Sequence, residues 1–152
     1  MLGAMTTDSG IEATVLLCDA ASGDPSGKMH MLGAGWSVTG SPTAPAAVVV
    51  LLKVPWVRAE TALYPSLRLV DADGRTVLVN QKPVGVRQEL GPGRRPDVPA
   101  GVPIDASFAL KVSPLPLPAG RYRWLLELDG DEIYAIGMFG LIFGRNKNLI
   151  ES

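Results

Sequence analysis

The sequence predicts an all-β domain, an antiparallel β-sandwich of eight or nine strands. Apolar residues recur with a period close to two along most of the chain, which is the pattern of half-buried strands. Glycine and proline number 17 and 13 among 152 residues, so turns interrupt the chain often. No segment has the apolar pattern of an amphipathic helix longer than about two turns.

The first predicted strand is Glu12–Cys18, which alternates apolar and polar side chains. Residues 19–27 are rich in Asp, Ser, Gly and Pro and are expected to form a loop. Residues 28–38 alternate again and are predicted to form the second strand. Gly33 and Gly35 fall on one face of it, which indicates a bulge or a close approach of two backbones.

A proline-rich turn at residues 41–45 precedes Ala46–Val54, a run of aliphatic and β-branched residues. Such a run is typical of a strand that is buried on both faces. Pro55 interrupts it, so residues 56–62 are expected to leave the sheet or to form an edge. The pattern therefore places the most buried strand early in the chain.

Residues 71–74, Asp-Ala-Asp-Gly, are predicted to be the turn of a hairpin, flanked by Leu67 and Leu69 on one side and Val77 and Val79 on the other. The Asp-Gly pair suits the left-handed backbone of a tight turn. A short strand at residues 84–89 follows the hairpin.

Residues 90–103 hold four prolines and three glycines and are predicted to be a long surface loop. Ile104–Val112 alternates as a strand, residues 113–120 form a proline-rich crossover, and Arg121–Leu128 alternates again. A turn at Asp129-Gly130 returns the chain into a last strand at residues 132–138. We expect one domain at residues 11–138, with an N-terminal arm at 1–10 and a tail at 139–152.

The net charge of −1 gives no bulk attraction to nucleic acid or to anionic lipid. The apolar runs are shorter than the roughly 18–20 residues needed to span a bilayer, and the start of the chain lacks the basic region of a secretory signal. We therefore expect a protein that is not secreted by a signal peptide and is cytoplasmic or assembled into a particle such as a virion.

Catalytic motifs are lacking, so the sequence predicts no enzyme and no cofactor. A hydrolase of the serine or cysteine type needs a base, and His30, the one histidine, is expected to be an ordinary strand residue. Cys18 ends an apolar strand and is expected to be a small core residue. The carboxylates at residues 71–74 and 129–132 could bind calcium, but turn geometry already explains them, so no metal site is predicted.

The apolar tail is the strongest candidate for a protein interface. If it were free in water, it would expose a contiguous apolar surface, so it either completes the sheet as a last strand or docks on a partner. Arg94 and Arg95 on the long loop form a second candidate patch, since arginine suits interfaces. The predicted interface residues are Phe139, Leu141, Ile142, Phe143, Arg145, Lys147, Arg94 and Arg95.

Two resemblances add to this interpretation. The segments LPAGRYRW at 117–124 and LELDG at 126–130 resemble the penultimate strand of immunoglobulin-like and fibronectin-III-like sandwiches. That resemblance implies a tyrosine corner at Tyr122; Trp124 stands where antibody domains have a cysteine. The second resemblance rests on LLCDAA at 16–21, GAGW at 33–36, DADG at 71–74 and LPLPAG at 115–120. These are similar to a family of short uncharacterised proteins of actinobacteria and actinobacteriophages, from which no catalytic residues can be carried over.

Two functions remain open from the sequence. The first is a non-enzymatic structural module that assembles with itself or with a larger scaffold, such as a capsid decoration or tail protein of a phage. The second is a soluble cytosolic protein that binds a small molecule or a peptide between its loops. Convergence of Trp36, Trp56 and Trp124 on one exposed pocket would favour the second function, whereas their burial in the core would weaken it.

Overall fold

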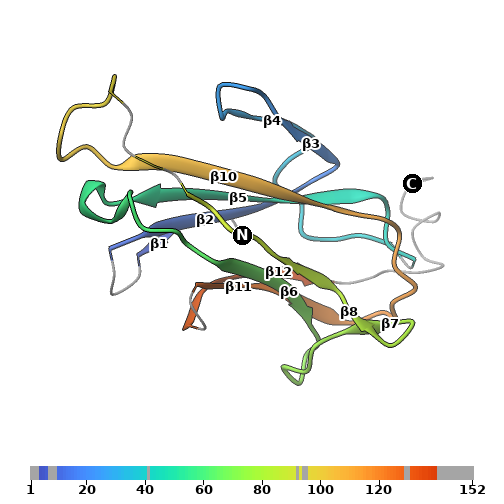
Figure 1. The fold of residues 1–152 in the computed structure, drawn as a ribbon. Coiled ribbons are helices and arrows are strands. Elements are labelled where there is room, and N and C mark those ends of the chain that lie inside the picture. Colours follow the sequence, from blue (N-terminus) through green and yellow to red (C-terminus); the bar gives the residue numbers. More distant parts are fainter. Residues whose placement is uncertain are drawn as a thin grey trace.

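The computed structural model is an all-β fold built on two four-stranded antiparallel sheets (Figure 1). The structure describes residues 4–6, 10–40, 42–91, 93, 96–128 and 131–139, with the backbone alone for 4–6 and 131–139. The first sheet has the order β1 (Ala4–Thr6), β2 (Glu12–Cys18), β5 (Ala46–Val54) and β10 (Ile104–Val112). The second has the order β12 (Asp131–Phe139), β11 (Arg121–Leu128), β6 (Pro65–Val70) and β9 (Gly85–Arg87).

Two short hairpins and one helical turn complete the described elements. One hairpin joins β3 (Ala20–Gly23) to β4 (Met29–Leu32), and the other joins β7 (Leu78–Val79) to β8 (Lys82–Pro83). The turn is a 3₁₀ helix at Trp56–Arg58. Twelve strands are thus distinguished in the described part of the chain, several of them only two to four residues long.

The two sheets face each other across one apolar core. Alternate residues of β2 and β5 point into it, among them Val15 and its cross-strand partner Val50. From the opposite sheet, β6 contributes Leu67 and Leu69, and β11 contributes Trp124. Each fully buried Val or Leu side chain stabilises the fold by about 1.5–3 kcal/mol, so this shared core is what holds the sheets together.

Four predicted strands, β2, β5, β10 and β11, have the predicted bounds, and β12 extends one residue beyond the prediction at each end. The predicted burial of β5 on both faces is also confirmed, since Val48 and Val50 lie in the main core and Val49 lies in a second cluster on the outer face. Residues 56–62 leave the sheet as expected, because Pro55 is followed by the 3₁₀ turn. β2, β10 and β11 alternate apolar and polar residues, whereas β5 is a continuous aliphatic run.

Two predictions in the N-terminal half were wrong. Residues 19–27 are not all loop, because Ala20–Gly23 form β3. The strand predicted over residues 28–38 ends at Leu32, because Gly33 and Gly35 have positive φ angles of 62° and 99°. At Gly33 the close neighbour is a side chain rather than a second backbone, because a Cβ atom there would collide with the carboxylate of Asp19.

The predicted hairpin at residues 71–74 extends from its turn as far as Leu69, whose carbonyl accepts the backbone N–H of Val77. Asp71 accepts the backbone N–H of Gly74, and Val70 bridges Thr76. The returning chain then leaves β6, because β7 pairs with β8 through Asn80 and Gln81, both with positive φ. A two-residue loop with two left-handed residues is the geometry of a type I′ turn. The sequence Asn-Gln is a weaker signal for this turn than Asn-Gly. The neighbour of β6 is β9, inside the predicted strand at residues 84–89.

The tyrosine-corner contact that the first resemblance implied is present. The Tyr122 hydroxyl donates a hydrogen bond of 2.8 Å to the carbonyl of Pro118, four residues upstream. The ring is buried in the main core, and burial raises the pKa of Tyr122. This bond ties the crossover at residues 113–120 to the first residues of β11.

Replacing Tyr122 with Phe keeps the buried ring and removes only the hydroxyl. We expect the variant to lose about 1 kcal/mol of unfolding free energy, because one hydrogen bond to a partly buried carbonyl is lost. Urea unfolding followed by tryptophan fluorescence measures this. The matched control is Tyr64→Phe, at an exposed tyrosine, and an equal loss in both variants would contradict the role of the corner.

Candidate functional site

The outer face of the first sheet carries a second layer of structure. The β3–β4 hairpin packs over β5 and β10 there, and a small buried cluster of Cys18, Ala21, Ala47 and Val49 fills the interface. Met29 and Met31 from β4 pack against this cluster. The hairpin covers only part of the sheet face, so a hollow remains beside it.

The loop of that hairpin is organised by Asp24. Its Oδ1 atom accepts the backbone N–H of Ser26 at 2.9 Å and of Lys28 at 3.2 Å, and it also accepts the Ser26 hydroxyl. Gly27 supplies the positive φ of 88° that the turn needs. Asp24 Oδ2 lies 2.9 Å from Nε2 of His30. The bonds from Ser26 and His30 lower the pKa of Asp24 to about 2.

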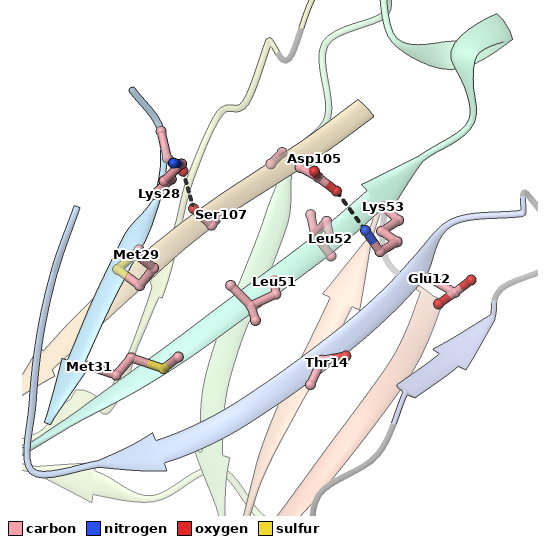
Figure 2. A pocket seen from close by; sticks show the side chains of 12 residues that line it. Glu12, Thr14, Lys28, Met29, Met31, Leu51, Leu52, Lys53, Asp105 and Ser107 are labelled. Atoms are coloured by element: carbon pink, nitrogen blue, oxygen red, sulfur yellow. Dashed lines mark hydrogen bonds and ion pairs between the residues drawn. The ribbon is translucent and has the colours of Figure 1, made fainter. Parts of the chain in front are cut away.

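The hollow beside the hairpin is an apolar groove of about 370 Å³. Met29 and Met31 form one wall and Leu51 of β5 lies at its floor, as Figure 2 shows. Methionine side chains adapt their shape to different apolar surfaces. The groove can therefore accept an apolar side chain or an extended segment without a fixed shape requirement.

Charged residues lie at one end of the groove in a row across three strands. Glu12 on β2 is the cross-strand partner of Lys53 on β5, and Lys53 is the partner of Asp105 on β10. Lys53 Nζ donates a hydrogen bond of 2.8 Å to Asp105 Oδ1 (Figure 2). That bond and the charge of Asp105, with a smaller contribution from Glu12, raise the pKa of Lys53.

A second, more polar hollow of about 300 Å³ lies against β10. It is bounded by Asp105, Ala106 and Ser107 of the strand, by the hairpin loop with Asp24, and by Leu90 and Gly91. The Ser107 hydroxyl donates to the carbonyl of Gly27 at 3.3 Å, which ties the hairpin loop to β10.

Most of the predicted interface residues lie outside the described part of the chain: Leu141, Ile142, Phe143, Arg145, Lys147, Arg94 and Arg95. Phe139 is described by its backbone as the last residue of β12, opposite Arg121. The predicted interface residues therefore stay a prediction.

The three tryptophans do not converge on either hollow. Trp124 is buried in the main core, and Trp36 packs partly buried against that core. Trp56 lies in the 3₁₀ turn, and no tryptophan lines the groove or the second hollow. The positions of the three tryptophans therefore do not favour ligand binding through stacked tryptophans.

His30 is an exposed strand residue, and its neighbours do not form a nucleophile–base pair. The Asp24 carboxylate lies between Ser26 and His30 and accepts a hydrogen bond from the Ser26 hydroxyl. In a hydrolytic triad the histidine, and not the carboxylate, contacts the nucleophile. The carboxylate of Asp71 is used by its own turn, where it accepts the backbone N–H groups of Asp73 and Arg75. Among the residues described, no group of three or more His, Cys, Asp or Glu could hold a metal ion.

The described residues contain no helix that could span a bilayer.

The groove was missed by the sequence analysis, because its walls come from distant segments. Met29 and Met31 do alternate with polar or exposed neighbours, which is a signal for one shared face. Nothing in that alternation indicates that this face covers Leu51 and lies next to Asp105.

Comparison with known proteins gives one match. The model of a family of unknown function, DUF6941, matches residues 13–138, from the start of β2 almost to the end of β12. No curated protein and no solved structure matches the chain.

The depressed pKa of Asp24 has a consequence that can be measured. A carboxyl whose folded pKa lies below its usual value of 3.8 stabilises the fold above that value and loses this contribution as the pH falls toward about 2. We expect Ser26→Ala to raise the pKa of Asp24 more than His30→Asn does, because the bond from Ser26 is the larger cause. Carbon-detected NMR titration of the Asp24 carboxyl group in each variant and in the wild-type chain measures both shifts; the reverse order would contradict this account of the loop.

Cys18 is expected to be unreactive in the folded protein. Burial raises the pKa of its thiol, and the charge of Asp19 adds to this, while Sγ contacts the Ala47 carbonyl at 3.4 Å. Since the thiolate is the reactive form, an aromatic disulfide reagent at pH 8 should label the chain only after unfolding in guanidinium. Rapid labelling of the native chain would show that the hairpin does not cover this cluster; Cys18→Ala provides the blank.

Proposed function

The chain belongs to the DUF6941 family, whose function is unknown. We propose that it is a non-enzymatic interaction module. It assembles with copies of itself or with a larger scaffold. The observation that carries the proposal is β10, a nine-residue strand at the edge of the first sheet, with β5 as its hydrogen-bonded neighbour in that sheet. A long edge strand offers unpaired backbone groups to a strand from another chain.

The chain is proposed to be an immunoglobulin-like sandwich that functions in a virion. The two facing sheets and the Tyr122–Pro118 bond support an immunoglobulin-like sandwich. The resemblance to actinobacterial and actinobacteriophage proteins supports a virion component, such as a capsid decoration or tail protein, located in the cytoplasm or in the assembled particle. The tail at residues 139–152 and the pair Arg94 and Arg95 serve as further contacts to the partner.

A second function is favoured by the apolar groove. Its volume of about 370 Å³ falls at the small end of ligand pockets, and its methionine wall suits an extended peptide. In this alternative the chain is a soluble cytosolic binding protein, and its ligand lies on the outer face of the first sheet rather than between loops.

The solution mass tests the proposed function. Light scattering over a dilution series should give a multiple of the 16.0 kDa chain mass, because the edge of β10 is proposed to pair with another chain. A version that ends at Phe139, the last residue of β12, should dissociate at a higher concentration if the tail contributes contacts. A monomer at every concentration in both versions would contradict self-assembly and favour the peptide-binding function.

A further inference from the structure

The free edge of β10 is the most specific unassigned surface in the described structure. Its nine residues pair with β5 along their whole length, from Ile104 opposite Val54 to Val112 opposite Ala46. On the other side of β10, no described strand is hydrogen-bonded to it. Beside Asp105 and Ser107 lies the second hollow, which the hairpin loop, Leu90 and Gly91 also line.

The charges on the outer face indicate what the next strand should carry. The row Glu12, Lys53, Asp105 alternates in sign from strand to strand and ends on an acid at the edge. Opposite charges on directly opposed residues stabilise a strand pair, and like charges destabilise it. A strand added to this edge is therefore favoured when it places a cation opposite Asp105.

The sequence of β10 itself meets that requirement. Asp105 and Lys111 are exposed and lie on the same face, because they are six residues apart. If two copies of β10 pair antiparallel about a twofold axis at Phe108, Asp105 of each copy lies opposite Lys111 of the other. Moving the axis by one residue in either direction separates both charge pairs.

The other face of β10 is compatible with the same register. In the twofold pairing, Ile104 lies opposite Val112 of the second copy, and Ala106 lies opposite Leu110. All of these are apolar, and Ala106, Leu110 and Val112 keep part of their surface exposed in the single chain. The pairing thus sets apolar against apolar on the core side and acid against base on the outer side.

We propose that the partner of this edge is a second copy of the chain, joined β10 to β10 about a twofold axis at Phe108. The two first sheets then form one continuous eight-stranded sheet with an isologous interface. This inference rests on the proposed function, because it names the partner and the register of the self-assembly.

Charge reversal at the edge tests the interface. Lys111→Glu places two pairs of like charges in the dimer, so the dimer dissociation constant should rise about tenfold. The matched control is Lys82→Glu, which makes the same change at an exposed lysine of β8 and should leave the constant unchanged. Thermal unfolding of both variants verifies that they fold.

Cysteine cross-linking tests the register. One chain carries Asp105→Cys and another carries Lys111→Cys, and mild oxidation of the mixture should yield a disulfide-linked dimer. Each variant alone should yield far less, since like positions are not opposed in this register. The native Cys18 is buried, and the wild-type chain measures its background.

The outcomes separate the two levels of the proposal. If the chain is oligomeric but Lys111→Glu dissociates like the control and the mixture does not cross-link, the β10 interface is wrong while self-assembly stands. If the wild-type chain is monomeric throughout, both the interface and the proposed self-assembly are wrong.

Discussion

Burial of β5 on both faces is the constraint on which the rest of the structure depends. Its inner face, with Val48, Val50 and Leu52, packs against the second sheet, while Val49 on its outer face packs under the β3–β4 hairpin. A strand without polar alternation is stable in water only when both faces are covered. The hairpin is therefore a required cover, and the groove is the part of the outer face that this cover leaves open.

The same arrangement accounts for the edge. β5 lies between β2 and β10, so β10 is the outermost strand on its side of the first sheet. Protein edges are often blunted by charge or by a covering loop. Here the hairpin loop reaches Ser107, whereas the two charges of β10 have opposite sign and complement each other in the proposed pairing of two copies.

The predictability of each element follows from the strength of its pattern. β2, β10 and β11 alternate over seven to nine residues between clear turn signals, so their bounds could be predicted. β3 consists of Ala, Ser and Gly, which bury little apolar surface, so no hydrophobic period marks it. The pairing of β7 with β8 depends on two left-handed residues, Asn80 and Gln81, whose conformation the residue types favour only weakly.

The candidate site could be predicted least, for a physical reason. The sequence alone determined the all-β class and the doubly buried strand, because each depends on neighbours a few residues apart or on a continuous run; the contact of Tyr122 was implied only by a resemblance. Only the tertiary structure decided that Met29, Leu51 and Asp105 meet on one face and that β10 lies at the edge. Strand order results from contacts between residues far apart in the chain. A local pattern of apolar and polar residues does not indicate which strands become neighbours.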